Sequence, residues 1–363
     1  MANSGSNRNG TNAAPFGQRG LSMVETLLAM GLSLVLILVV SQIYLGSKQS
    51  YALQEAQSRL QENGRYAMAI LARDIRRAGN MGCSSIKKAP VILAKSVPQI
   101  APATAIMGYD ANNTIAAYPY ATSETAETSQ WNPNAPDSLK AEDGSLKVVA
   151  GTDILSIQFA EPCGGGLQAK VEGMKAGPTA SLVSTNTCPI QPDSDVLILS
   201  DCGQTEIFRA DSVSPIKISG TSNNTMDHFT YTHDVDAEVM LFHSHTYFIR
   251  LFNDEPTLYR QEDTEVVPTA QPILEGVEDM QILYGVDGDP ADGSVDRYLT
   301  ARNASGLWPQ VIAVRIDLVV RSSGDDGKYL TSTSANACNG VTVNDRRLRK
   351  CYSFTVNLRN PRS

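Results

Sequence analysis

The feature that most constrains this chain is an apolar stretch close to its start. From Leu21 to Leu45 there are 25 residues with a single charge, Glu25. At a rise of 1.5 Å per residue, a helix of that length spans about 37 Å. That exceeds the roughly 30 Å hydrocarbon core of a bilayer, so the stretch predicts a membrane-spanning helix.

Two ordinary explanations of this stretch are incomplete. A cleaved secretory signal has an apolar core of about 7–15 residues and a small-residue cleavage site behind it. The apolar core here is longer, and Ser41 to Ser47 provide no such site. A plain signal anchor fits the length but leaves Glu25 unexplained, because a carboxylate inside a bilayer costs on the order of a few kcal/mol.

A third explanation accounts for the acid. Gly20 is followed by Leu21, and Glu25 is the fifth residue after that glycine, with about twenty apolar residues beyond it. This arrangement resembles the class III signal of type IV pilins and pseudopilins. The resemblance implies that a prepilin peptidase cuts between Gly20 and Leu21 and methylates the new amino terminus. It also implies that Glu25 acts in assembly. Leu21 departs from the family, which most often has Phe at this position.

The helical pattern continues beyond the apolar stretch. We expect one continuous helix from about Leu21 to Arg77, half of it in lipid and half of it packed on a globular domain. Gly79 and Gly82 suit its C-terminal end, and Arg76 and Arg77 complement the dipole there. The apolar residues of the second half recur every three or four positions: Leu53, Ala56, Leu60, Gly64, Ala67, Leu71, Ile75 and Ala78.

Several longer segments resemble minor pilins of the PilW family. They are Ser47 to Glu55, Gln61 to Ala67, Leu71 to Cys83 and Gly276 to Val286. The resemblance runs from Gly20 to the C-terminus and is weakest from Lys87 to Asp143. It implies an α+β, type IV pilin-like fold in which the long N-terminal helix packs on a large antiparallel β-sheet domain.

The expected organisation follows from these observations. Residues 1–20 form a leader peptide, 21–46 a transmembrane or filament-core helix, and 47–78 an amphipathic continuation of that helix. Residues 79–363 form a periplasmic β-rich domain with a loop-rich insertion at about 87–145, where Pro, Ala, Thr, Asn and Ser dominate. Strands are predicted at Asp153 to Ala160, Val196 to Leu199, Glu206 to Arg209, Val239 to Phe252, Met280 to Tyr284, Val311 to Arg321 and Cys351 to Leu358.

Charge and cysteine content agree with an exported domain. Arg19 beside the apolar run favours a cytoplasmic N-terminus, so the chain would cross the inner membrane once with its C-terminal domain in the periplasm. The chain has a net charge of −8, and its basic clusters have no aromatic residues between them. We therefore do not expect it to bind nucleic acid. All six cysteines follow the apolar stretch: Cys83, Cys163, Cys188, Cys202, Cys338 and Cys351.

An even number of cysteines in an exported domain favours disulfides. Six cysteines allow about 15 complete pairings, and the sequence does not select one. The single pairing we favour is Cys338 with Cys351, which flank a short polar loop. No spacing typical of a zinc–thiolate site is present.

Two groups of residues suggest metal chemistry. Asp287, Asp289, Asp292 and Asp296 form a calcium loop or only an acidic turn between strands, because their spacing departs by one residue from a calcium-loop pattern and no terminal Glu follows. Calcium is therefore the one cofactor considered for the chain. His243 and His245 share one face of a predicted strand, but no carboxylate stands at a diagnostic spacing from them. The alternative to metal binding is that the two histidines are packed and hydrogen-bonded within the domain.

No catalytic signature is found, so an enzyme is not expected. Cys163 to Gly166 lack the Gly-Lys-Ser/Thr of a phosphate loop, and no nucleophile elbow occurs. The resemblance implies a minor pilin in a priming or tip complex of a type IV pilus, first in the inner membrane and then in the pilus, supporting motility or adhesion. Its partners would be other minor pilins, the major pilin, a tip adhesin and the prepilin peptidase. The alternatives are a type II secretion pseudopilin of the J kind and, from another class, a signal-anchored periplasmic enzyme or calcium-dependent binding module.

Overall fold

The structure is a computed structural model. It describes residues 22–82, 90–95, 105–111, 124–125, 131–140, 147–167, 169–175, 179–180, 188–213, 216–218, 223–265, 268–288, 291–322, 335–336, 342–343 and 347–359. The chain divides into two compact units, Met1–Ala52 and Leu53–Ser363, and each is described by itself.

Helix α1 (Met23–Arg77) begins directly after a capping residue. The Ser22 hydroxyl accepts a hydrogen bond from the Glu25 backbone N–H at 3.2 Å, which satisfies one of the free donors of the first turn. Gly79, with φ at 75°, follows the helix in the left-handed conformation that ends many helices. The predicted continuous helix is therefore present, although Leu21 lies outside the described residues.

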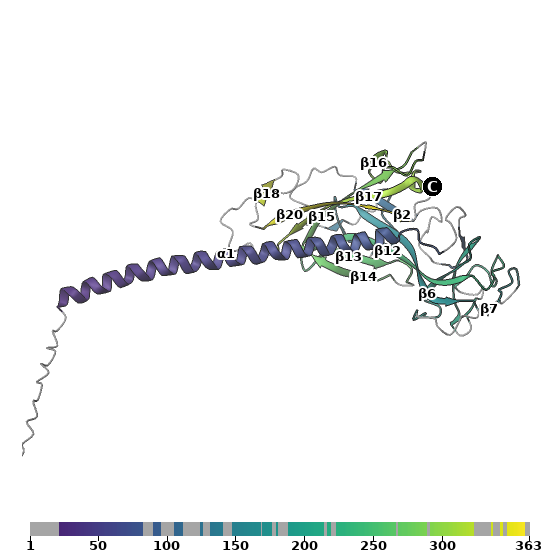
Figure 1. The fold of residues 1–363 in the computed structure, drawn as a ribbon, viewed down its shortest axis with the longest axis horizontal. Helices are drawn as coiled ribbons and strands as arrows, with labels where there is room; N and C mark the ends of the chain where they lie inside the picture. Colours follow the sequence, from purple (N-terminus) through teal and green to yellow (C-terminus); the bar gives the residue numbers. More distant parts are fainter. Residues whose placement is uncertain are drawn as a thin grey trace, which may run out of the picture. The chain divides into compact units, whose positions relative to one another are not determined.

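The strands follow α1 in a long series (Figure 1). The larger ones are β2 (Ile106–Ala111), β6 (Ile154–Gly166), β8 (Val196–Ser200), β9 (Thr205–Arg209), β12 (Glu238–Phe252), β13 (Glu255–Glu262), β14 (Ala270–Glu275), β15 (Val277–Val286), β17 (Val311–Arg321) and β20 (Arg349–Asn357). The short ones are β1 (Val91–Ile92), β3 (Glu124–Thr125), β4 (Trp131–Asn132), β5 (Val148–Val149), β7 (Thr179–Ala180), β10 (Ser212–Val213), β11 (Ile216–Lys217), β16 (Arg297–Leu299), β18 (Ala335–Asn336) and β19 (Thr342–Val343). The described part of the chain also contains two 3-10 turns, η2 (Asp137–Leu139) and η3 (Trp308–Gln310).

Two sheets make up most of the domain. In the described part of the chain, the larger has nine strands in the order β1-β9-β8-β12-β6-β2-β4, with β13 paired to β12 and β14 paired to β13. Its pairs are antiparallel except β1 with β9. The second sheet has the order β16-β15-β17-β20 and is antiparallel. The α+β class expected from the sequence is confirmed.

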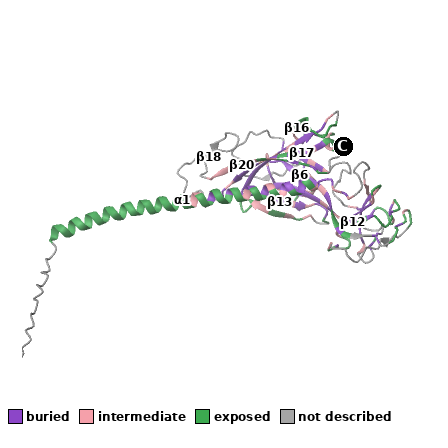
Figure 2. Cartoon of the chain, viewed as in Figure 1, coloured by how far each residue is buried: buried purple, intermediate pink, exposed green. Residues whose placement is uncertain are grey.

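The second half of α1 contributes to the largest hydrophobic core. Ala67, Leu71 and Ile75 are completely buried there, in one cluster with residues of β6, β12, β15 and β17. Figure 2 shows purple, buried positions on this half of the helix and green, exposed positions along the segment before it. The helical periodicity in the sequence thus identified the face of α1 that packs on the sheets.

The sequence failed to identify three of the longer strands of the larger sheet, β2, β13 and β14, as well as the two-residue strands β1 and β4. The segment expected to be a loop-rich insertion supplies β2 to that sheet. It also supplies Trp131, which is 1% exposed and donates a hydrogen bond from its indole N–H to the Thr152 carbonyl at 2.8 Å. Strands β13 and β14 were missed as well. Their burial does not alternate clearly, so a period of two is absent from both.

Disulfides are confirmed among the cysteines that follow the apolar stretch. Cys163, on β6, is bonded to Cys188. Cys202 and Cys351 are also disulfide-bonded. The pairing favoured from the sequence, Cys338 with Cys351, stays a prediction because Cys338 lies outside the described residues, as does Cys83.

Gly64 allows α1 to lie close to β20. A Cβ atom at Gly64 would stand 2.1 Å from Cζ of Tyr352, whose hydroxyl is fixed by a hydrogen bond to the Leu60 carbonyl at 2.7 Å. The aromatic ring of Tyr352 therefore occupies the space that a side chain at Gly64 would need.

We expect Gly64→Ala to lower the thermal midpoint of unfolding. In an exposed helix, Gly→Ala stabilises by about 1 kcal/mol, whereas overpacking of a core costs about 1–3 kcal/mol. The matched control is Gly46→Ala, since no atom lies within 4 Å of a Cβ at that position. In a Tyr352→Leu background, Gly64→Ala should no longer destabilise. A Gly64→Ala protein as stable as the Gly46→Ala protein would contradict this packing argument.

Candidate functional site

The first candidate site is the start of α1, where the sequence placed the assembly residues. Glu25 lies in the first turn of the helix, where a negative charge complements the helix dipole. No described residue forms an ion pair with its carboxylate. Gly20 and Leu21, the predicted cleavage site, lie outside the described residues, so processing stays a prediction.

The apolar side chains behind Glu25 are exposed in this unit. From Met23 to Leu45 the large ones have exposed fractions between 47% and 84%. Among the described residues, α1 is the one helix that is long and apolar enough to cross a membrane. An exposed apolar surface of this extent needs either lipid or other apolar helices around it.

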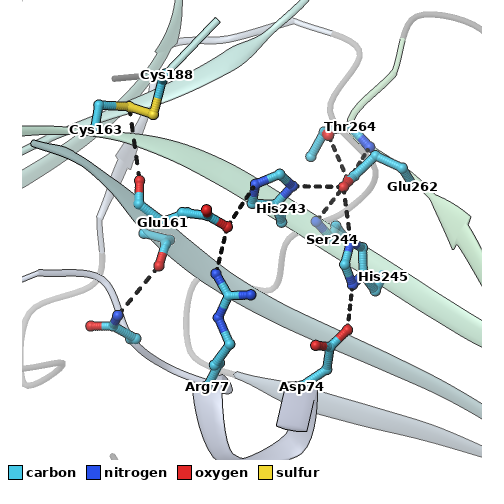
Figure 3. Close-up of polar contacts among 12 residues, drawn as sticks. Asp74, Arg77, Glu161, Cys163, Cys188, His243, Ser244, His245, Glu262 and Thr264 are labelled. Atoms are coloured by element: carbon cyan, nitrogen blue, oxygen red, sulfur yellow. Dashed lines mark hydrogen bonds and ion pairs between the residues drawn. A yellow bond between two sulfur atoms is a disulfide. The ribbon is translucent and has the colours of Figure 1, made fainter. Parts of the chain in front are cut away.

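The second candidate site lies where α1 ends on β12. Asp74, in the last turn of α1, is completely buried. Its Oδ2 atom accepts a hydrogen bond from Nδ1 of His245 at 2.7 Å (Figure 3). The same oxygen accepts a hydrogen bond from the Tyr247 hydroxyl, also at 2.7 Å. Asp74 lies on the apolar face of the helix beside Leu71 and Ala78, three and four positions away, so its charge must find partners inside the protein.

The chain of hydrogen bonds continues from His245 to Glu262 on β13. Nε2 of His245 lies 3.2 Å from Oε2 of Glu262, and Nδ1 of His243 lies 2.8 Å from the same oxygen. The other carboxylate oxygen accepts hydrogen bonds from the Ser244 backbone N–H at 2.9 Å and the Thr264 hydroxyl at 2.6 Å. The antiparallel register of β12 and β13 places His245 opposite Glu262. We call Asp74, His243, His245 and Glu262 the junction cluster.

A second ion pair borders the junction cluster. Nη2 of Arg77 lies 2.7 Å from Oε2 of Glu161, on β6, and that oxygen lies 3.9 Å from Nε2 of His243. The Arg77 guanidinium also stacks over the ring of Phe159, with Cζ 4.1 Å from its centroid. The end of α1 is therefore held on β6 as well as on β12.

The ionisation of the cluster follows from these contacts. Burial raises the pKa of Asp74, but hydrogen bonds from His245 and Tyr247 outweigh burial and bring the pKa to about 2. Burial lowers the pKa of His245, but its hydrogen bonds to Asp74 and Glu262 raise the pKa above the ordinary value overall. For Glu262, burial raises the pKa, and donation from His243 and His245 brings it well below its usual range. Both ring nitrogens of His245 face carboxylates, so the cluster is suited to an imidazolium between two carboxylates.

The junction cluster opens into a cavity of about 530 Å³. His243, His245, Glu262, Arg77 and Arg260 are among the residues that line it. Nitrogen and oxygen atoms of His243, His245 and Glu262 lie within 4.8 Å of one another, and these three residues could hold a metal ion. The sequence predicted the two histidines on one strand face but not Glu262, because β13 was not recognised as their partner strand.

The other two histidines do not join this cluster. His233 is completely buried, with Nδ1 2.9 Å from Asp201 and Nε2 2.9 Å from Glu206. His228 lies 2.8 Å from its neighbour Asp227. The structure therefore separates them from the pair on β12.

The acidic loop after β15 uses its carboxylates as acceptors for its own backbone. The Asp287 carboxylate accepts from the N–H groups of Asp292 at 3.2 Å and Gly293 at 2.9 Å. Oδ2 of Asp296 accepts from the Gly288 N–H at 2.6 Å. The carboxylates of Asp287 and Asp296 therefore stabilise the turn through hydrogen bonds to its backbone. Asp289 lies outside the described residues, and calcium binding stays a prediction.

Comparison with known families bears on the C-terminal part of the chain. Residues 246–360 match the family model described as type IV pilus-assembly protein W, PilW. This region is similar to PilW. The match covers about a third of the chain, from β12 to the end of β20, and includes the segment Gly276 to Val286 that resembled the family in sequence. Helix α1 and the segments from Ser47 to Cys83 lie outside it.

The other two comparisons gave no match. No curated protein and no solved structure is significantly similar to the chain. The PilW match over residues 246–360 supports involvement of the chain in type IV pilus assembly.

We expect Tyr247→Phe to weaken the junction at Asp74. The substitution removes one hydroxyl donor from a buried carboxylate and keeps the ring, so the free energy of unfolding should fall by about 1.5–3 kcal/mol. Urea unfolding of the full chain in detergent, followed by the fluorescence of Trp131 and Trp308, measures it. The exposed Tyr298→Phe should change this value by less than about 0.5 kcal/mol. Equal effects of the two substitutions would show that the Asp74 contact contributes no stability.

Proposed function

We propose that the chain is a minor pilin, built into the priming or tip complex of a type IV pilus. The observation that carries the proposal is the PilW match over residues 246–360. Helix α1 supports it, because its apolar segment is long enough to cross a membrane. In this proposal the same segment serves first as membrane anchor and then as filament core, where neighbouring pilin helices cover it again.

Glu25 has two possible roles at the start of α1, and they can be separated. The sequence Ser22-x-x-Glu25 has the spacing of a capping box, in which the acid supports the first turn of the helix. In the assembly role, the carboxylate pairs with the methylated amino terminus of an adjacent subunit. Such a pair would offset the cost, on the order of a few kcal/mol, of placing a carboxylate in lipid.

Mass spectrometry of the N-terminal peptide from cells with a functional pilus system tests the processing step. The expected species begins at an N-methylated Leu21. An intact Met1, or a chain that begins near Ser47, would contradict the minor pilin proposal and support a signal-anchored or secreted protein instead.

Glu25→Gln tests the assembly role. Glutamine also serves at the third helical position of a capping box, so the helix start is retained while the charge is lost. We expect less of the chain to co-purify with other pilins and fewer pili on the cell surface. The control is Glu55→Gln on the same helix, which removes an exposed carboxylate paired with Arg59 at 2.6 Å.

Equal pilin recovery with Glu25→Gln and wild type would show that the charge of Glu25 has no role in assembly.

Deletion of the gene distinguishes a function in the type IV pilus from a function in type II secretion. Loss of surface pili or twitching supports the pilus, whereas impaired protein secretion with intact twitching supports a type II secretion pseudopilin of the J kind.

A further inference from the structure

We propose that His243, His245 and Glu262 bind one first-row transition metal ion, with zinc as the ion to test. The proposal goes beyond a role in pilus assembly and does not depend on it. Two imidazole nitrogens and one carboxylate oxygen are a ligand set that zinc uses in proteins, with the fourth position left to water or another ligand.

The distances between the ligand atoms are close to those of such a site. Zinc–ligand bonds of about 2.0–2.1 Å in a tetrahedron place neighbouring ligand atoms about 3.3 Å apart. Nε2 of His245 already lies 3.2 Å from Oε2 of Glu262, and Nδ1 of His243 lies 2.8 Å from it. An ion therefore requires His243 and Glu262 to separate by roughly half an ångström. The nitrogens of the two histidines lie within 4.8 Å of each other, and side-chain torsions must bring them to the same spacing.

Hydrogen bonds behind the ligands hold each one in the required orientation. In metal sites, a ligating histidine usually donates its other ring N–H to a carboxylate or carbonyl. Nδ1 of His245 is placed in this way on Asp74 at 2.7 Å, and Nε2 of His243 faces Glu161 at 3.9 Å. On Glu262, the Ser244 N–H and the Thr264 hydroxyl hold Oε1, which directs Oε2 toward the two rings.

The surroundings give the ion access and an open coordination position. His243 and Glu262 are partly exposed and line the cavity of about 530 Å³, from which an ion and a water molecule can reach the ligand atoms. The protons balance in a simple way. Zinc binds Nε2 of His245 and Nδ1 of His243 only after both have lost their hydrogens. The Nε2 proton of the His245 imidazolium passes to solvent, and the Nδ1 proton of His243 is replaced by one on Nε2 of the same ring, which faces Glu161, so one proton is released for each zinc ion bound.

A bound ion would tie three elements together. His243 and His245 come from β12, Glu262 from β13, and Asp74 connects His245 to the end of α1. Zinc should therefore fix the end of the helix on the sheet more firmly than the hydrogen bonds alone, and unfolding of the domain should become dependent on zinc concentration.

The experiment uses the full chain in detergent, purified without a polyhistidine tag and stripped with a chelator. Zinc is titrated in competition with a chromophoric chelator, and the thermal midpoint is measured with and without zinc. We expect one zinc ion per chain and a higher midpoint with zinc. His243→Gln and Glu262→Gln should each weaken binding at least about 100-fold and abolish the shift in the midpoint.

The control is His228→Gln, which removes a histidine outside the cluster and should leave zinc binding unchanged. A wild-type chain that binds no zinc at micromolar concentration, or a folded Glu262→Gln chain that binds it as wild type does, would overturn the proposal. If neither ligand variant folds, X-ray absorption of zinc-loaded wild type decides. Two imidazole ligands support the site, and their absence overturns it.

Discussion

The packing of the second half of α1 against the two sheets is the constraint on which the rest of the domain depends. Ala67, Leu71 and Ile75 lie in one core with strands of both sheets, and the ring of Tyr352 fills the space above Gly64. At the end of this row the apolar face carries an acid, Asp74, instead of another apolar residue. The apolar row determines which face of α1 packs on the sheets. The hydrogen bonds of Asp74 to His245 and Tyr247 hold the last turn of the helix against β12.

Much of this arrangement could be predicted from the sequence, because it rests on regular patterns. The helical row from Leu53 to Ala78 and the apolar residues at every second position from Ile312 to Val320 each indicated a buried face. In β17, Val319 and Ala313 are buried as well, so both faces of that strand are partly covered. The burial of Asp74 could also have been predicted from the sequence, since a carboxylate at helical spacing from Leu71 and Ala78 indicates a buried acid that needs a partner.

The partners of that acid could not be found in the same way. His245 is 171 positions from Asp74 in the chain, and no local period connects the two. Glu262 lies on β13, where polar residues such as Thr257 and Gln261 are buried and the usual alternation is lost. The junction cluster thus depends on pairing between strands, and this pairing decides which carboxylate faces the two histidines.

The two acids of α1 pose the same electrostatic problem in two environments. Asp74 is buried in the domain and has His245 and Tyr247 as donors within the chain. Glu25 stands in an apolar segment, and no described residue forms an ion pair with its carboxylate. A buried carboxylate is stable only when a donor or cation accompanies it. If the apolar segment enters lipid or a filament, the group that accompanies Glu25 must therefore come from the helix start itself or from another subunit, and substitution by glutamine separates these two sources.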